Sequence, residues 1–504
     1  MIMKKLYTIL VALLLLVSNS TFCQPSDKNN RIMESFIQKG MIDWEIPGLA
    51  VAIVKNGKLV FQEAYGVREL GKKNPVDINT IFSIASTTKA ITVACLGILV
   101  DEEKLNWNDP VIKHFPEFRL KDPYITKNLT VRDLLTHRAG MPNTDLFWIT
   151  PNFDKEEIFR RMELIDPAYS FRSSYTYQNI MYAVAGEVVA RVSGVPWHQF
   201  VNERIFTPLS MTYSVPLMSE ITSIENKVTP HYIIEGKPET IVTTSTDPVA
   251  PAGSIWSSIG DMSKWLAFML DSANVNGKRL LSASTYSEIL KPNHIIPKNS
   301  FYSTTALTKP NWTTYGLGWF QHDYRGKMVE FHTGSIGGLI AIVGMIPSEK
   351  IGVCVLANMD HAELRHAIMY KSFDLYAFND NSRDWHQEIF NLYKGSDDAE
   401  AVQDQEKEDS RVEGTKTSLE KLDSYAGVFE DGIFGKIDVT FSDEELVFNF
   451  NETEIGRLTH WHYDTFKLIF SKKYWGSSSV NFNLNSEGDI EELEFFGITW
   501  MKKN

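Results

Sequence analysis

The sequence has few cysteines and no recognisable metal or phosphate motif. Only three of its 504 residues are cysteine, and Cys95 and Cys354 stand in apolar runs typical of small core side chains. Two such residues cannot build a disulfide framework or a structural zinc site with conventional spacing. A His-Glu-x-x-His string and a glycine-rich loop ahead of a helix are also missing from the sequence. We therefore expect neither a metal nor another cofactor.

Positive charge is scarce as well. The chain has 50 Lys and Arg against 63 Asp and Glu, a formal net charge of -13. Nucleic-acid binding depends on Lys and Arg that release counterions from the phosphates, and no basic stripe interleaved with aromatic residues occurs. We expect no nucleic-acid partner.

Long apolar runs are missing apart from residues 6–17, which follow two lysines and precede small and polar residues. This run is too short for a permanent membrane span and has the order of an export signal. We predict a signal peptide over residues 1–23, cleaved before Gln24, and an exported protein of the periplasm or cell envelope. A buried N-terminal helix is one alternative. Lipidation of Cys23 is another, and it would be the route to membrane association, although Phe22 is bulky for a lipoprotein signal.

Residues 24–385 predict an α+β domain. Asn56-Gly57 separates two alternating apolar runs, the strongest short signal for a β-hairpin. Two further apolar strands, 339–346 and 351–357, flank a turn near the end of this region, and helical patterns fill the middle. Strands at both ends with helices between them indicate one antiparallel sheet built from distant segments.

The composition changes at the end of this domain. Residues 396–409 contain seven acidic residues, one Lys and no aromatic residue, so we predict an acidic, solvated linker over 386–418. From 419 to 504 apolar and polar residues alternate with a period of two between turns. This pattern predicts a small all-β domain, a meander or barrel.

Ser86 and Lys89 form the first of the strings that carry chemistry. The spacing Ser-x-x-Lys is weak evidence alone, since Ser418 and Lys421 repeat it where only a linker end is expected. Ser86, however, opens a predicted helix, on which residues i and i+3 share a face. The Ser86 N–H at a helix N-terminus is unpaired and partly positive, which suits an oxyanion donor. A serine at this position has a neighbouring base and one oxyanion donor, which are the groups that an acyl-transfer nucleophile needs.

Lys89 needs help to act as a base, because lowering its pKa from ~10.4 to near 7 requires ~4.6 kcal/mol. Tyr177, in the string Tyr177-Gln178-Asn179, has a similar problem because a phenol titrates near ~10. We expect a shared proton network of Ser86, Lys89 and Tyr177, in which the sequence does not assign the base to one residue. Asn179 can donate and accept hydrogen bonds toward a substrate amide.

A third string, His332-Thr333-Gly334, leads through further glycines into the strand at 339–346. Glycine there permits close approach of a ligand to the backbone. We expect the Ser335 N–H to be the second oxyanion donor.

These strings, with others along residues 30–385, resemble the family of class C serine β-lactamases and penicillin-binding proteins, which includes D-aminopeptidases, D-Ala-D-Ala carboxypeptidases and esterases. The segments that carry the resemblance are Phe82–Lys89, Leu134–Pro142, Tyr177–Asn179, Pro251–Ser254, Tyr315–Trp319 and His332–Gly334. The resemblance implies an antiparallel sheet sandwiched by helices, a helical subdomain, and an active site between them. The tail from about 419 is similar to a small lipocalin-like domain that some members carry.

Carried over to this chain, the family pattern makes Ser86 the nucleophile, Lys89 and Tyr177 the acid/base pair, and Asn179 a substrate contact. It places His332, Thr333 and Gly334 along the substrate pocket. Dedicated β-lactamases usually have Lys where His332 stands, and that lysine holds a substrate carboxylate. Histidine is only partly charged near neutral pH, so β-lactam turnover is disfavoured relative to a peptidase or an esterase.

We therefore predict an exported serine hydrolase that forms an acyl-serine intermediate with a small peptide, amide or ester substrate. A non-catalytic receptor for muropeptides or β-lactams is the alternative from another class. A second alternative makes the C-terminal β-domain the ligand-binding part.

Overall fold

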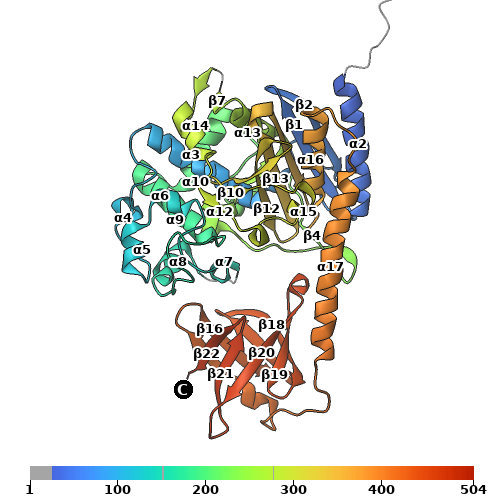
Figure 1. Ribbon diagram of the computed structural model, residues 1–504. Helices are drawn as coiled ribbons and strands as arrows, with labels where there is room; N and C mark the ends of the chain where they lie inside the picture. Colours follow the sequence, from blue (N-terminus) through green and yellow to red (C-terminus); the bar gives the residue numbers. More distant parts are fainter. Residues whose placement is uncertain (1–24, 150–152, 276, 504) are drawn as a thin grey trace, which may run out of the picture.

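A computed structural model describes residues 25–149, 153–275 and 277–503 of the chain. The signal peptide expected over 1–23, and Cys23 with it, lie outside the described residues. Two units follow one another along the chain, a larger unit of sheet and helices and a barrel, with the long helix α17 running from one to the other (Figure 1). None of the helices in the described part is long and apolar enough to cross a membrane.

The larger unit is built on an eight-stranded antiparallel sheet, as the sequence predicted. Its strands, in spatial order, are β2 (Lys58–Gly66), β1 (Gly48–Lys55), β14 (Ile351–Ala357), β13 (Leu339–Ile346), β12 (Lys327–Ile336), β11 (Phe320–Tyr324), β10 (Thr313–Tyr315) and β9 (His294–Ile295). Segments from the beginning and the end of the larger unit thus become neighbours near one edge of the sheet, where β1 pairs with β14. The hairpin of β1 and β2 turns at Asn56 and Gly57, whose φ angles of 53° and 72° explain why this dipeptide stands there.

Both faces of the sheet are covered. Along β1, Ala50, Ala52 and Val54 belong to one core cluster, and the alternate residues Leu49 and Val51 belong to another. The first face is covered by α3 (Thr88–Asp101), α13 (Ile259–Leu270) and the helical subdomain. The second is covered by α2 (Pro25–Asp43) and α16 (Leu364–Tyr376). Strict alternation of two apolar sets is what a sheet buried on both faces requires.

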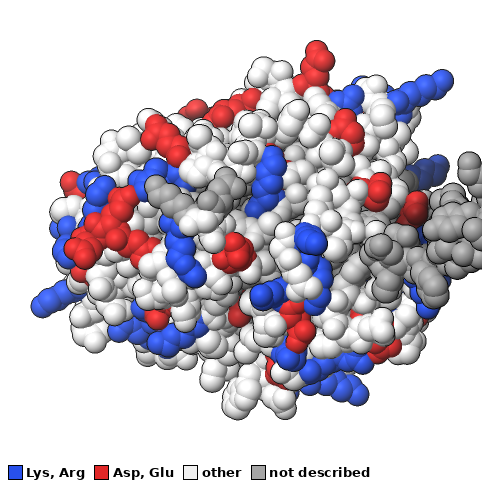
Figure 2. All heavy atoms as spheres, turned by 90° about the horizontal axis from the view of Figure 1, so that it is seen from above, with Lys and Arg blue, Asp and Glu red and all other residues white. Residues whose placement is uncertain are grey.

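The helical subdomain lies beside the sheet (Figure 1). It contains α4 (Val111–His114), α5 (Pro123–Asn128), α6 (Val131–Leu134), α7 (Leu146–Ile149), α8 (Lys155–Met162), α9 (Asn179–Ser193) and α10 (Trp197–Val201), which runs through a π-helical turn into α11 (Thr207–Leu209). The remaining short elements of the larger unit are β3 (Ile81–Ser83), β4 (His231–Ile234), β5 (Lys237–Thr240), α12 (Ala250–Gly253), β6 (Trp256–Ser258), β7 (Asn274–Val275), β8 (Lys278–Arg279), α14 (Ala283–Ile289) and α15 (Thr305–Thr308). The end of the larger unit seen in Figure 2 carries acidic and basic side chains interspersed.

Most of the predicted acidic linker over 386–418 forms a feature that the sequence did not predict, the continuous helix α17 (Trp385–Asp409). Trp385 and Ile389 are fully buried against the larger unit and anchor its first turns. Beyond them the helix is solvated, and its many Glu, Gln, Ala and Lys residues are good helix formers. The acidic composition predicts a solvated linker, and the same residue types suit an exposed helix.

The C-terminal unit is a closed antiparallel barrel, as the alternating pattern indicated. Its strands are β15 (Gly427–Asp431), β16 (Gly435–Ser442), β17 (Glu445–Phe450), β18 (Thr453–His462), β19 (Thr465–Phe470), β20 (Ser477–Leu484), β21 (Ile490–Phe495) and β22 (Ile498–Lys502). Aromatic side chains dominate its interior, among them Phe448, Phe466 and Trp500, all fully buried. Side chains therefore fill this barrel, as in small closed barrels generally. Its lipocalin-like character stays a prediction.

Candidate active site

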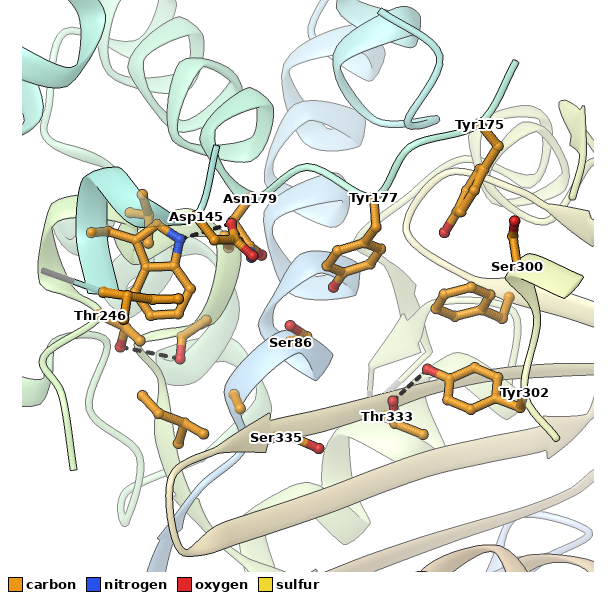
Figure 3. A pocket seen from close by; sticks show the side chains of 18 of the residues that line it. Ser86, Asp145, Tyr175, Tyr177, Asn179, Thr246, Ser300, Tyr302, Thr333 and Ser335 are labelled. Carbon is orange, nitrogen blue, oxygen red and sulfur yellow. Dashed lines mark hydrogen bonds between the residues drawn. The ribbon is translucent and has the colours of Figure 1, made fainter. Parts of the chain in front are cut away.

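The three sequence motifs around Ser86, Tyr177 and Thr333 converge on one cavity of about 490 Å³, between the helical subdomain and the sheet (Figure 3). Its wall is formed by Ala85, Ser86, Asp145, Trp148, Ile149, Tyr175, Tyr177, Asn179, Thr246, Val249, Ala252, Gly253, Ser300, Phe301, Tyr302, Phe320, Thr333, Ser335 and Ile336. Most of this wall is apolar or aromatic, and a few polar groups point inward, the usual make-up of a small-molecule site.

Ser86 lies in a tight helical turn, residues 85–87, between β3 and α3. The turn holds Ala85 in the left-handed region at φ 43°. Strand β12 passes close against it, because a Cβ at Gly334 would lie 2.2 Å from the carbonyl oxygen of Ile84. Glycine at this position is therefore required by close packing against the serine turn rather than by a ligand. The result is a half-buried Ser86 that faces the cavity.

Lys89 is fully buried one turn further along. Its Nζ donates to Ser86 Oγ at 3.0 Å, to Asn179 Oδ1 at 2.7 Å and to the carbonyl of Ala252 at 2.9 Å. Burial lowers the pKa of Lys89 to about 7, and the negative charge of Asp145 opposes the shift without cancelling it. Near neutral pH a large share of Lys89 is thus a neutral amine within hydrogen-bonding distance of the serine hydroxyl.

Tyr177 lies beside this pair, and its hydroxyl points toward Ser86 (Figure 3). Burial raises the pKa of Tyr177 well above its ordinary value, and the hydrogen bond to Ser86 only partly offsets this. The Lys89 Nζ lies 4.7 Å from the centre of the Tyr177 ring. The His137 ring packs against the same Tyr177 ring, with 4.3 Å between the ring centres. The opposite pKa shifts distinguish Lys89 from Tyr177, which the sequence left as equivalent candidates for the base. Only Lys89 has a pKa close to neutral pH, as a general base requires.

Asn179 has its side-chain amide fixed by two neighbours. Its Oδ1 accepts from Lys89, and its Nδ2 donates to Asp145 Oδ1 at 3.0 Å. The same Asp145 oxygen accepts from the Trp148 indole at 2.9 Å. One N–H of the Asn179 amide remains for a substrate carbonyl.

His332 does not line the cavity, which corrects the expected pocket position. Thr333 and Ser335 line the cavity, whereas His332 lies behind its wall and Gly334 packs against the serine turn. His332 is 1% exposed, and burial lowers its pKa to about 3. It is therefore neutral at physiological pH and cannot hold a carboxylate as a lysine would.

Neutral His332 belongs to a hydrogen-bonded chain behind the cavity wall. Its Nδ1 donates to the Thr333 carbonyl at 2.6 Å, so its Nε2 is left to accept from the Tyr315 hydroxyl at 3.0 Å. Tyr315 in turn accepts from Nε2 of His137 at 3.2 Å, because Nδ1 of His137 accepts the Gln178 N–H at 3.0 Å. Each donor in this series of hydrogen bonds has an acceptor only when both histidines are neutral. Burial lowers the pKa of His137 as well, which agrees with a neutral ring.

The cavity edge of β12 is held from outside by Arg365. Its guanidinium donates to the Gly334 carbonyl at 2.7 Å and to Ser335 Oγ at 2.8 Å, and it forms a buried, two-point ion pair with Glu363. Thr333 is held by the Tyr302 hydroxyl at 2.5 Å. These contacts fix the strand that carries the expected oxyanion donor, the Ser335 N–H.

Asp145, His137, Tyr315 and Arg365 were not predicted as site residues. His137 and Tyr315 lie within segments that carried the family resemblance, so position in those segments was an available signal. Asp145 follows such a segment after two residues, and Arg365 stands in a helix with no motif. Their roles depend on contacts between distant elements.

A comparison with protein-family models matches residues 33–372 to the Beta-lactamase model. The chain belongs to the β-lactamase family of serine hydrolases. A second model, described as a domain of unknown function (DUF3471), matches residues 410–503 and covers the barrel.

Among individual relatives, the chain is similar to the Unguisins hydrolase ungD of Aspergillus violaceofuscus (strain CBS 115571), at 29% identity over 62% of this chain and 59% of the relative. It is also similar to Protein flp of Staphylococcus aureus (strain MW2), at 25% identity over 65% of this chain and 62% of the relative. The chain thus spans about 60% of the length of these curated relatives. Among solved structures, the octameric penicillin-binding protein homologue from Pyrococcus abyssi matches with a TM-score of 0.61 at 21% identity, covering 94% of this chain and 99% of that chain. At this identity the likeness shows the fold.

Proposed function

We propose that this member of the β-lactamase family hydrolyses small peptide, amide or ester substrates through an acyl-Ser86 intermediate. The observation that carries the proposal is the contact between Ser86 Oγ and Lys89 Nζ at 3.0 Å, with burial lowering the pKa of Lys89 to about 7. A neutral amine at that distance is the activated arrangement that a serine nucleophile needs.

In the acylation step, Lys89 takes the proton of Ser86 as Oγ attacks the substrate carbonyl. The N–H groups of Ser86 and Ser335 receive the oxyanion. As the tetrahedral intermediate collapses, the bond to the leaving group breaks and that group takes the proton of the Lys89 ammonium, directly or relayed by the Tyr177 hydroxyl, so that Lys89 is again a neutral amine. In deacylation, water attacks the acyl-serine ester and Lys89 accepts the proton of the water. As the ester bond breaks, Ser86 Oγ takes that proton back from Lys89 and the carboxylic acid product is released.

The charge of the cavity favours some substrates over others. Asp145 is the one charged side chain among the described residues of its wall, and His332 is neutral behind that wall. A carboxylate next to the scissile bond, as in β-lactams and D-Ala-D-Ala peptides, would meet no Lys or Arg side chain among the described residues of the wall, since Lys89 and Arg365 are buried behind it. Peptidase activity toward substrates with a free amine, of the D-aminopeptidase type, and esterase activity are favoured over carboxypeptidase and β-lactamase activity. The Aspergillus relative is named a hydrolase, which is consistent with this class of reaction.

Labelling with a fluorophosphonate probe tests the proposal against a non-catalytic receptor. The wild-type chain should be labelled, Ser86→Ala should not, and Ser418→Ala, at the other Ser-x-x-Lys string, should be labelled like the wild type. Hydrolysis of D-amino-acid amides, short esters and a chromogenic cephalosporin should then fall in that order of kcat/KM, or with esters first. Failure of the wild type to react with any probe or substrate would favour the receptor.

We also propose that the protein is exported to the periplasm or cell envelope, on the strength of its first 23 residues. Fractionation of cells that express the full chain should place it outside the cytoplasm. Removal of residues 2–23 should retain the protein in the cytoplasm, and unchanged fractionation would contradict export.

A further inference from the structure

A second cavity, of about 570 Å³, lies where the barrel meets the larger unit. The larger unit contributes Trp148, Ile149, Phe153, Thr243, Thr244, Ser245, Asp247 and Pro248, and the barrel contributes Thr453, Glu454, Ile455, Ser471, Lys472 and Trp475. We call this space the interdomain groove. Its wall combines apolar and aromatic surface with a few polar groups, as ligand sites do.

The interdomain groove adjoins the active site. Trp148 and Ile149, at the end of α7, line both cavities. On the opposite side, Thr246 lines the active site while its neighbours Ser245 and Asp247 line the groove. A substrate that extends from Ser86 past Trp148 would therefore enter the groove.

The barrel is seated on the larger unit by contacts that flank the groove. On one side Arg161 donates to the carbonyl of Ile433 at 2.6 Å, and the rings of Phe147 and Phe434 lie 5.1 Å apart. On the other side the Tyr474 hydroxyl donates to the carbonyl of Val242 at 3.2 Å. In Figure 1 the barrel accordingly lies below α7, at the end of the larger unit that carries the helical subdomain.

Lys472 provides the groove with a positive charge that no carboxylate neutralises. Its Nζ donates to Thr244 Oγ1 at 3.0 Å and lies 4.7 Å from the centre of the Trp475 ring, and it takes part in no ion pair among the described residues. Burial lowers the pKa of Lys472, and no acidic neighbour offsets that shift. Of the two acidic residues in the wall, Glu454 is exposed, and Asp247 accepts the backbone N–H groups of Met218 and Ser219. A half-buried cation without a counter-ion is a site for an anion.

We propose that the interdomain groove binds the carboxylate end of an extended peptide substrate, with Lys472 as the group that recognises it. The proposal rests on the proposed function and assigns the barrel a part in substrate selection. Asp145 is the charged side chain beside Ser86, and Lys472 is the one basic side chain among the described residues of the groove wall. Such a site suits a short peptide whose carboxylate is separated from the scissile bond, and it excludes one whose carboxylate lies next to that bond.

The test compares two forms of the same peptide, one with a free C-terminal carboxylate and one with a C-terminal amide. For the full wild-type chain the ratio of kcat/KM, carboxylate over amide, should exceed one. Lys472→Ala should lower that ratio about tenfold, the size expected for loss of a charge-assisted hydrogen bond. Lys472→Arg should retain the ratio, and Lys472→Glu should invert it. Lys473→Ala, at the exposed neighbour, should leave both the ratio and the turnover unchanged.

Binding of the carboxylate peptide to the full-length Ser86→Ala chain, measured by calorimetry, gives a readout without catalysis. Affinity should fall when Lys472→Ala is added. The proposal is overturned if Lys472→Ala lowers both substrate forms equally, which would indicate only displacement of the barrel, or if it changes neither the ratio nor the affinity. Failure of the proposed function is distinct, because the wild type would then show no Ser86-dependent labelling or turnover at all.

Discussion

The interiors of the two units differ in what they bury. The larger unit encloses Lys89, with three hydrogen-bond acceptors around its Nζ, and the neutral chain of His137, Tyr315 and His332. The core of the barrel consists of apolar and aromatic side chains such as Phe448. Burying a charge destabilises the fold whereas burying an aromatic ring stabilises it, so a buried lysine is retained for chemistry rather than for stability. The first interior accounts for reactivity, and the second supplies a rigid surface beside it.

The largest difference between the two units should appear in activity. Lys89→Ala should lower kcat/KM for a short ester about 10³-fold or more, as should Ser86→Ala, because each removes a member of the nucleophile–base pair. Steady-state kinetics with circular dichroism as a check on folding measures this. A variant of Lys89 that keeps more than a tenth of the wild-type rate would assign the base elsewhere.

The converse change tests the barrel. Phe448→Ala should destabilise the barrel by about 3–5 kcal/mol through loss of buried ring surface and the cavity left behind. Phe441→Ala, at a position 43% exposed on the neighbouring strand, should cost no more than about 0.5 kcal/mol. Calorimetry should show the loss of stability as a lower temperature of one unfolding transition. At temperatures below that transition, Ser86 should still be labelled. Equal shifts for the two variants would contradict the aromatic core.

The cost of the buried lysine should be visible as a pH dependence of stability. Between about pH 7 and 10 the unfolded chain binds a proton on Lys89 that the folded chain does not, since the folded pKa is lowered from 10.5 to about 7. The wild-type free energy of unfolding should therefore rise with pH in that window, relative to Lys89→Met, by about 1.4 kcal/mol per pH unit. Urea unfolding at several pH values measures the difference. Parallel curves for the two proteins would show that Lys89 is not perturbed.

Several of these features could be predicted from the sequence and others could not. Ser86 and Lys89 were placed together because their spacing on a predicted helix is a local signal, and Tyr177 was added because its string occurs in the same chain. His332 was expected to line the cavity but is buried behind the wall, since the string alone does not say which of its residues reaches the cavity. The helix α17 was not predicted, because an acidic composition indicates a solvated segment without saying whether that segment is helical. Asp145 and the position of the barrel beside Trp148 depend on contacts that only folding creates.

A smaller effect would refine the electrostatics of the site. Asp145→Asn should shift the ascending limb of the profile of kcat/KM against pH to lower pH, by less than about one unit, because the carboxylate stabilises the Lys89 ammonium. A shift to higher pH would contradict that sign.

The most direct measurement is the rate at which Ser86 is acylated by a fluorophosphonate as a function of pH, with the adduct located by mass spectrometry. We predict an adduct on Ser86 and a rate that rises with an apparent pKa near 7, both lost in Lys89→Met. An adduct on another residue, or a rate that keeps rising to pH 10 without a limb near 7, would contradict a neutral Lys89 as the base.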